Sequence, residues 1–462
     1  MRFYIGVENF AKIESAEICV NQYTLLVGPN NSGKTFLMQL AEGVNDYLED
    51  LIDEEALNEL PVRQENKYVL LEFTKDSVAN FTKIINKHIA EKKEDIVRTL
   101  LGTDVAVGKL YINIEFEKEE GYRIYRFTNI KDAQETLPEI QFLKKISSNS
   151  YKGSIGVLQR ADQAENGGML SISIGLDNNA KWEVRHQVVE LLRKKSLFMP
   201  ASRNGLMMLY REFFAHKTDD YISFTVNGSK IEKQNKGISG LTQPVYNFLR
   251  FLQTYNYTNS RYDGDRYKEE LEFYDNQIIE GHIKINEQGT LAYLPKEEKI
   301  SVPLHLVSSM VNEVAPLYMA ITSDRIYDRL IIDEIEASLH PEKQMKLVRF
   351  LNRLYNDGIH FIISTHSDTF VSKLNNLCVL SEYVKRTGND DALRQLSLTA
   401  KDVIPLENLY VYEFINHSDG KSTVKEISFN EKLGYQFDLF TDSALRLYNE
   451  AAQIQEIVNN EC

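Results

Sequence analysis

The stretch Tyr23-Thr24-Leu25-Leu26-Val27-Gly28-Pro29-Asn30-Asn31-Ser32-Gly33-Lys34-Thr35 decides the fold that we expect for this chain. Its apolar first part is typical of a strand buried on both faces. Gly28 and Gly33, followed by Lys34 and Thr35, match the phosphate-loop pattern, in which backbone N–H groups surround the phosphates of a nucleotide. A helical pattern follows Thr35. The order strand, loop, helix therefore predicts a site for a nucleoside triphosphate.

The loop predicts how each part of the nucleotide is held. Lys34 would reach the β- and γ-phosphates, and the Thr35 hydroxyl would bind Mg²⁺. We expect ATP and Mg²⁺ as the cofactors. The expected nucleotide-binding residues of the loop are Gly28, Pro29, Asn30, Asn31, Ser32, Gly33, Lys34 and Thr35.

Two carboxylates and a histidine follow later apolar runs. Asp333 and Glu334 come directly after the strand pattern that begins at Arg329. Asp333 would hold Mg²⁺ through its water shell, and Glu334 would act as the general base for the attacking water. The run His360–Thr365 leads into His366, which would donate a hydrogen bond to the γ-phosphate. The expected catalytic residues are thus Glu334, His366 and Lys34, with Thr35 and Asp333 as the Mg²⁺ ligands.

Composition restricts the class of protein. The chain has 462 residues, of which 43% are hydrophobic and 26% charged, as in ordinary globular proteins. Its net charge of −14 argues against a protein that coats nucleic acid through its overall field, but leaves DNA binding through a local basic patch open. The three cysteines are isolated, and no apolar run of about 18 residues occurs. We therefore expect a cytoplasmic protein with no membrane segment.

In order along the chain, four segments resemble the Walker A, Walker B, D-loop and H-loop of ABC-class ATPases. They are Gly28–Thr35, Leu330–Glu334, Ser338–Pro341 and Ser364–Ser367. This class includes the heads of SMC proteins, RecF-like DNA-repair ATPases and the overcoming-lysogenisation-defect (OLD) family. The resemblance implies an α/β fold, a P-loop NTPase head with a mixed sheet, and adds Ser338 to the expected nucleotide contacts.

The distance between the motifs predicts a split head. Residues 1–45 would form its first part and residues 301–462 its second, with a mixed α/β and helical lobe inserted over 46–300. Within that lobe, 109–116 and 122–127 alternate like two paired strands, and 244–277 has a helical pattern. The tyrosines, phenylalanines and arginines of the last segment fit a stacking platform for single-stranded nucleic acid, but helical periodicity favours core packing. Asp263 and Asp265 fit a solvated loop better than a metal site.

The class resemblance also implies a dimer. ATP would lie between two heads, and each site would borrow a signature helix from its partner. Ser308 and Ser309 begin the helical pattern in the expected place and would face the γ-phosphate of the other subunit. Met310 stands where the class often has glycine, which indicates slow turnover. The Q-loop residue is left between Gln159 and the segment ending at Arg203.

The remaining sequence favours a particular role within this class. The insert has no long heptad run like an SMC arm, and no nuclease-like acidic pattern follows His366. Among the ATPases of this class, the chain resembles the stand-alone ATPases of bacterial anti-phage systems of the PARIS or Septu type. That resemblance implies a homo-oligomer that senses a phage component or DNA and controls a separate nuclease or toxin. The alternatives are a RecF-like DNA-repair ATPase and a scaffold that holds ATP as a structural ligand.

Overall fold

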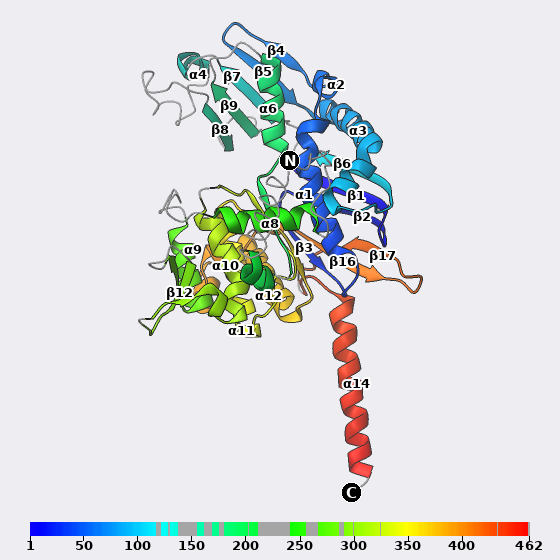
Figure 1. Cartoon of the computed structure of the whole chain (residues 1–462), viewed down its shortest axis with the longest axis vertical. Coiled ribbons are helices and arrows are strands. Elements are labelled where there is room, and N and C mark those ends of the chain that lie inside the picture. Colours follow the sequence, from blue (N-terminus) through cyan, green and yellow to red (C-terminus); the bar gives the residue numbers. More distant parts are fainter. Residues whose placement is uncertain are drawn as a thin grey trace, which may run out of the picture. The chain divides into compact units, whose positions relative to one another are not determined.

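The structure is a computed structural model of the chain. It describes residues 1–116, 122–127, 130–136, 155–160, 169–174, 180–201, 203–210, 241–255, 267–285, 291–298, 300–323, 325–431 and 433–460. These residues group into two compact units (Figure 1). The first contains Met1–Gly6, Val44–Ile96 and Lys109–Lys194, and the second contains Val7–Gly43, Val97–Gly108 and Lys195–Cys462.

A mixed sheet carries the phosphate loop, and nine of its strands lie in the described part of the chain. In spatial order they are β10 (Ser196–Met199), β14 (Arg329–Ile332), β15 (His360–Thr365), β3 (Tyr23–Val27), β16 (Leu409–Asn416), β17 (Ser422–Glu426), β2 (Ile13–Cys19), β1 (Arg2–Phe10) and β6 (Val107–Glu115). Neighbours from β10 to β16 are parallel, β16 and β17 are antiparallel, and β17 and β2 are parallel. This is the α/β P-loop fold that the sequence predicts.

The three motif strands are neighbours in this sheet. Ile332 of β14 pairs with Ile363 of β15, and Thr365 of β15 pairs with Val27 of β3. All residues of β3 and β14 are buried, as unbroken apolar runs predict for central parallel strands. Because parallel strands end at the same sheet edge, the loop after Val27 and the carboxylates after Ile332 are brought together.

Helices cover the sheet of the second unit (Figure 1). Its core joins β3, β10, β14, β15 and β16 to α8, α10, α11 and α12 through residues such as Leu25, Phe251, Val314 and Phe361. The helices are α8 (Gln243–Thr254), α9 (Lys268–Phe273), α10 (Ser309–Thr322), α11 (Pro341–Asn356), α12 (Asp368–Thr387), α13 (Asp391–Gln395) and α14 (Asp438–Asn460). A π-helix over Tyr274–Ile279 leads into a small sheet of β11 (Gly281–Ile285), β12 (Leu291–Pro295) and β13 (Val302–Pro303).

The first unit contains a second, five-stranded sheet in the order β4-β5-β7-β9-β8. Its strands are β4 (Val62–Gln64), β5 (Tyr68–Phe73), β7 (Tyr122–Phe127), β8 (Ile155–Arg160) and β9 (Met169–Ile174). Its other elements are α2 (Glu54–Asn58), α4 (Ile130–Thr136) and α6 (Ala180–Leu192), while α1 (Lys34–Leu51) and α3 (Lys75–Leu101) each have residues in both units.

Three expectations about the insert differ from the structure. Segments 109–116 and 122–127 do not pair: β6 lies beside β1, whereas β7 pairs with β5 and β9. The described residues between 195 and 300, expected in the inserted lobe, group with the phosphate loop, since β10 adds to the large sheet. The helical pattern over 244–277 is divided among α8, α9 and the π-helix, and Phe248, Leu249, Phe251 and Leu252 are buried as core packing predicts. Asp263 and Asp265 lie outside the described residues.

Much of the last helix, α14, is exposed. Every residue from 445 to 455 of α14 is exposed, including Leu447, Tyr448 and Ile454. Among the described residues, no helix has both the length and the apolar character needed to cross a bilayer.

Candidate nucleotide site

Lys34 is the first residue of α1, and its side chain contacts the phosphate loop that precedes it. Its Nζ donates hydrogen bonds to the carbonyls of Gly28 and Pro29, both at 2.9 Å, and to the Ser32 hydroxyl at 3.2 Å. Burial lowers the pKa of Lys34 to about 8, although Asp333 and nearby glutamates favour the charged form. The ammonium is thus held where strand β3 meets the N-terminus of α1, the usual position for binding phosphate.

The two glycines of the loop are required by close packing. A Cβ on Gly33 would lie 2.8 Å from Ile13 Cγ1, and the φ of Gly33, +98°, is in the region that favours glycine. A Cβ on Gly28 would lie 2.6 Å from Phe414 Cβ and 2.9 Å from the Phe414 carbonyl. Any side chain at either position would push the loop away from β2 or β16.

Thr35 and Asp333 lie together although they are far apart in sequence. The Thr35 hydroxyl donates a hydrogen bond of 2.6 Å to Asp333 Oδ2. The other carboxylate oxygen, Oδ1, accepts a hydrogen bond from Ser364 Oγ, which fixes the carboxylate plane. A hydroxyl and a carboxylate are hard oxygen ligands of the kind that Mg²⁺ prefers, so this pair fits the ion that the sequence predicts.

Glu334 adopts a backbone conformation that is unusual for its residue type. Its φ is +48°, in the left-handed region that costs about 1 to 3 kcal/mol for a residue other than glycine. Its backbone N–H donates to Ser364 Oγ at 2.8 Å. This geometry directs the carboxylate to His366, with Glu334 Oε1 3.6 Å from His366 Nε2. The separation is too long for a direct hydrogen bond, but it places the carboxylate and the imidazole side by side.

The segment after Glu334 is also fixed by polar contacts. Glu336 accepts a hydrogen bond from the backbone N–H of His366, and Gln344 accepts one from the Ser367 hydroxyl. His340 caps the N-terminus of α11. Ser338 is exposed, with a left-handed φ of +58°. The side chain of Ser338 therefore lies on the surface of the head.

The predicted signature helix begins where the sequence indicates. Ser308 is the N-cap of α10 and Ser309 its first residue, and both are exposed. Met310 is half-buried and packs against the main core. Glycine at this position would remove that contact, which gives a structural reason for methionine here.

The two Q-loop candidates lie in different places. Gln159 is in β8 of the first unit, and its side chain lies outside the described residues. Arg203 is only 1% exposed, and its guanidinium is bonded to the backbone of Asp333 and Glu334. Arg203 thus lies behind the carboxylates and is not placed to contact a nucleotide directly.

The contacts of two polar residues that support the site were not predicted from the sequence, although Ser364 lies in the H-loop-like segment. Ser364 binds both Asp333 and the backbone of Glu334, and Glu313 on α10 forms a buried ion pair with Arg203 at 2.7 Å. Each lies beside other polar residues, Ser364 before Thr365 and Glu313 after Asn312. A polar side chain next to an apolar run is a usable signal, since a buried polar side chain generally needs a specific partner.

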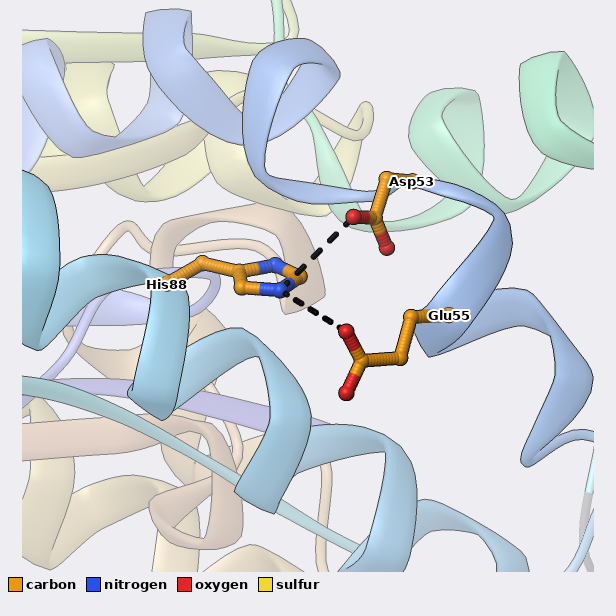
Figure 2. A group of neighbouring side chains, drawn as sticks. All are labelled: Asp53, Glu55 and His88. Atoms are coloured by element: carbon orange, nitrogen blue, oxygen red, sulfur yellow. Dashed lines mark ion pairs between the residues drawn. The ribbon is translucent and has the colours of Figure 1, made fainter.

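The first unit contains a separate group of charged side chains, Asp53, Glu55 and His88 (Figure 2). His88 Nδ1 donates to the Leu51 carbonyl at 3.1 Å, so Nε2 faces Asp53 and Glu55 at 3.6 and 3.7 Å. Both carboxylates are half-exposed, and Lys87 pairs with Glu55 at 3.1 Å. Together with the Lys87–Glu55 ion pair, these contacts connect the start of α2 to α3.

Comparisons with known proteins cover only part of the site described above. Residues 227–372 match the family model described as "AAA domain, putative AbiEii toxin, Type IV TA system", a range that includes Asp333, Glu334 and His366 but not the phosphate loop. No curated protein matches the chain. The chain is thus similar to an ABC-type ATPase domain over the matched range, and its sheet has the topology of a P-loop NTPase fold.

Solved structures of SMC heads are similar over most of the chain. An SMC head bound to the C-terminal winged-helix domain of ScpA has 10% identity and a TM-score of 0.36, covering 92% of this chain and 97% of that one. The SMC head domain from Thermotoga maritima has 12% identity and a TM-score of 0.32, with coverage of 93% and 100%. The ScpA-bound head from Pyrococcus furiosus has 12% identity and a TM-score of 0.32, with coverage of 97% and 98%.

Proposed function

We propose that this chain is a slow ATPase whose heads dimerise around ATP and, by doing so, control a separate effector protein in anti-phage defence. The observation that carries the ATPase part is the contact of 2.6 Å between Thr35 and Asp333. It brings the hydroxyl after the phosphate loop and the carboxylate after β14 to one point. Two oxygen ligands placed there beside a buried lysine suit Mg²⁺-ATP.

The residues of the site then divide the chemistry among them. Bound Mg²⁺ would neutralise charge on the β- and γ-phosphates. Lys34 would exchange its loop carbonyls for phosphate oxygens, and Glu334 would accept the proton of a water held in line with the γ-phosphate. His366, 3.6 Å from the Glu334 carboxylate, would donate to the γ-phosphate and hold that water in place.

Head dimerisation is supported by the exposed serines at the start of α10. A helix N-terminus with free hydroxyls is suited to binding a phosphate, and Ser308 and Ser309 are both accessible. In the proposed dimer they would bind the γ-phosphate held by Gly28–Thr35 of the other head. Ser338 would lie at the same junction. Each active site would then be complete only when two chains meet.

Control of an effector is supported by two observations. The description of the matched family names a toxin of a type IV toxin–antitoxin system. In addition, α14 exposes Leu445, Leu447, Tyr448 and Ile454, each more than half accessible. An exposed apolar helix of this kind is typical of a protein-binding surface. We propose that it binds the partner chain in the cytoplasm.

Two substitutions test the proposal. Lys34→Ala should abolish ATP binding, whereas Glu334→Gln should bind ATP, fail to hydrolyse it and accumulate as a dimer. Light scattering after size exclusion, with and without Mg²⁺-ATP, measures the dimer. A Glu334→Gln protein that stays monomeric with saturating ATP would contradict head dimerisation. Effector activity that is the same with wild type, Lys34→Ala and Glu334→Gln would rule out ATP control.

The same assays separate the alternative roles. Stimulation of hydrolysis by duplex DNA, with an affinity that falls steeply as salt rises, would favour the RecF-like role. Bound ATP with no hydrolysis in a single-turnover experiment at high protein concentration would favour a structural nucleotide.

A further inference from the structure

We infer that Arg203 is a positioning residue that links the signature-like helix α10 to the two carboxylates of its own head. This inference rests on the proposed dimer. It adds to that dimer a route by which binding of the γ-phosphate at one ATP site would affect hydrolysis at the other. The predicted nucleotide site gives Glu313 no role and includes Arg203 only as the end of a candidate Q-loop segment.

The guanidinium of Arg203 contacts three separate segments. It donates to the Pro200 carbonyl at the end of β10 at 3.1 Å, and to the carbonyls of Asp333 and Glu334 after β14 at 2.6 and 3.0 Å. From α10, the Glu313 carbonyl accepts a hydrogen bond from Nε at 3.2 Å, and the Glu313 carboxylate pairs with the guanidinium at 2.7 Å. A single buried group therefore connects the helix and the catalytic turn.

The contact between Arg203 and Glu334 holds a residue whose backbone conformation is strained. The left-handed φ of Glu334 persists only if its surroundings hold it. The Glu334 N–H is held by Ser364 and its carbonyl by Arg203. Loss of the Arg203 contact would free one side of this turn, and the carboxylate would leave the position beside His366.

Glu313 is the matching group on the helix. It lies one turn after Ser309, its side chain is 2% exposed, and its Oε2 also accepts from the Asn204 backbone N–H at 3.2 Å. Burial raises the pKa of the Glu313 carboxyl, while Arg203 favours its ionised form. A buried ion pair is a poor way to add stability, but it gives strong geometric coupling between the elements that it joins.

These contacts define a mechanical connection. A phosphate that binds Ser308 and Ser309 acts on the first turn of α10, and Glu313 moves with that turn. The guanidinium follows the carboxylate because both are buried and bonded. The Asp333 and Glu334 carbonyls shift in response. Occupation of one ATP site would in this way set the position of the general base in the other.

Glu313→Gln tests this connection because it removes the charge and keeps the size of the side chain. We expect the Kd for Mg²⁺-ATP to change less than threefold, since Lys34 and Thr35 are untouched. We expect kcat to fall at least tenfold and cooperativity between sites to be lost, with a Hill coefficient near 1. Glu342→Gln, which alters an exposed glutamate on α11, is the control and should change neither quantity.

A double-mutant cycle distinguishes coupling from simple structural support. Ser309→Ala and Glu313→Gln, alone and combined, should have non-additive effects on kcat, because both interrupt one route. Additive effects, or an unchanged kcat in Glu313→Gln, would overturn the inference. If Glu313→Gln lowers the melting temperature, Glu313→Met supplies the same comparison with an apolar side chain of similar size.

Experiments on the wild type and Glu334→Gln distinguish failure of this inference from failure of the proposed function. ATP hydrolysis by the wild type and ATP-dependent dimers of Glu334→Gln test the function alone. If both are observed and the Glu313 variants behave like wild type, only the Arg203 connection is wrong.

Discussion

The Thr35 hydroxyl lies 2.6 Å from Asp333 Oδ2, although 298 residues separate the two in sequence. The contact exists because β3 and β14 flank β15 in one parallel sheet and end at the same edge. Ser364, at the end of β15, holds the second carboxylate oxygen. The segments that follow β3 and β14, and the end of β15 itself, therefore each bring one oxygen-bearing side chain to the same place.

Asp333→Asn should separate nucleotide binding from metal binding. The amide keeps an oxygen for Ser364 but loses the charge that attracts Mg²⁺, so we expect ATP to bind without the usual gain in affinity from Mg²⁺. Phosphate release should fall at least about 100-fold, as expected when a metal site is lost. ATP affinity with and without Mg²⁺ and steady-state phosphate release measure the two effects.

The control is Asp368→Asn, which changes an exposed carboxylate at the start of α12. Unchanged hydrolysis in Asp333→Asn would exclude Asp333 as the metal ligand.

Binding of ATP should depend on pH through Lys34. Burial lowers the pKa of Lys34 to about 8, so its ammonium is charged below pH 8 and neutral above it. Bound phosphates favour the charged ammonium of Lys34. At a pH where Lys34 of the free protein is neutral, ATP binding must therefore be accompanied by the uptake of a proton. At pH 8.5 the expected uptake is about 0.8 of a proton, and at pH 9 the affinity should be about tenfold weaker than at pH 7.

Calorimetry in two buffers of different ionisation enthalpy measures this uptake. Lys34→Arg is the matched control, because a guanidinium stays charged across this range and should take up no proton. Equal proton uptake by the wild type and Lys34→Arg would show that another group titrates.

Asp402 should be important for the stability of the second unit. Its buried carboxylate accepts hydrogen bonds from Arg349 at 3.1 Å and Arg353 at 2.9 Å. Burial alone would raise the pKa of Asp402, but these partners outweigh it and hold the pKa below its ordinary value. A lowered folded-state pKa adds stability above the unfolded value of about 3.9, and this stability is lost as pH falls through the folded-state pKa.

Asp402→Ala leaves two arginines without their buried partner, and we expect a loss of about 3 to 5 kcal/mol in the free energy of unfolding. Asp391→Ala removes an exposed pair with Arg394 and should cost less than about 1 kcal/mol. Urea unfolding at pH 7 compares the two variants, and similar losses would contradict the assigned role of Asp402. The difference between Asp402→Ala and the wild type should shrink below about pH 4.

The exposed face of α14 should be neutral for folding. Leu447 is 67% and Ile454 is 53% exposed, so the double change Leu447→Gln and Ile454→Gln should alter the free energy of unfolding by no more than about 0.5 kcal/mol. Leu347→Ala, at a fully buried position of α11, should cost about 2 to 5 kcal/mol. Urea unfolding measures both, and a large loss in the α14 variant would mean that this helix packs on the chain itself.

Local sequence was sufficient for the elements of the site. An apolar run followed by Gly28–Thr35 predicts strand, loop and helix because glycine conformations and hydrogen-bonding needs are set within a few residues. The same holds for the strand that ends at Asp333, and for His366 after β15. The α/β fold class followed from these same local motifs, through their resemblance to ABC-class ATPases.

Non-local partners were outside the reach of the sequence. The alternation of 109–116 and 122–127 is a property of each strand, but β6 joins the large sheet and β7 joins another, because strand pairing is decided by which apolar faces can be buried together. The grouping of the described residues between 195 and 300 with the phosphate loop reflects the pairing of β10 with β14, which no local pattern shows.

What the sequence by itself determined is therefore the identity of the groups that we expect to meet ATP: a lysine, a threonine, two carboxylates and a histidine, each marked by the strand before it. What only the tertiary structure decided is how those groups are held. Arg203 and Glu313 are 110 residues apart and no sequence pattern pairs them, yet their buried ion pair connects α10 to the turn that carries Glu334. The physical reason is that burial makes every polar group depend on a specific partner, and folding alone brings that partner within reach.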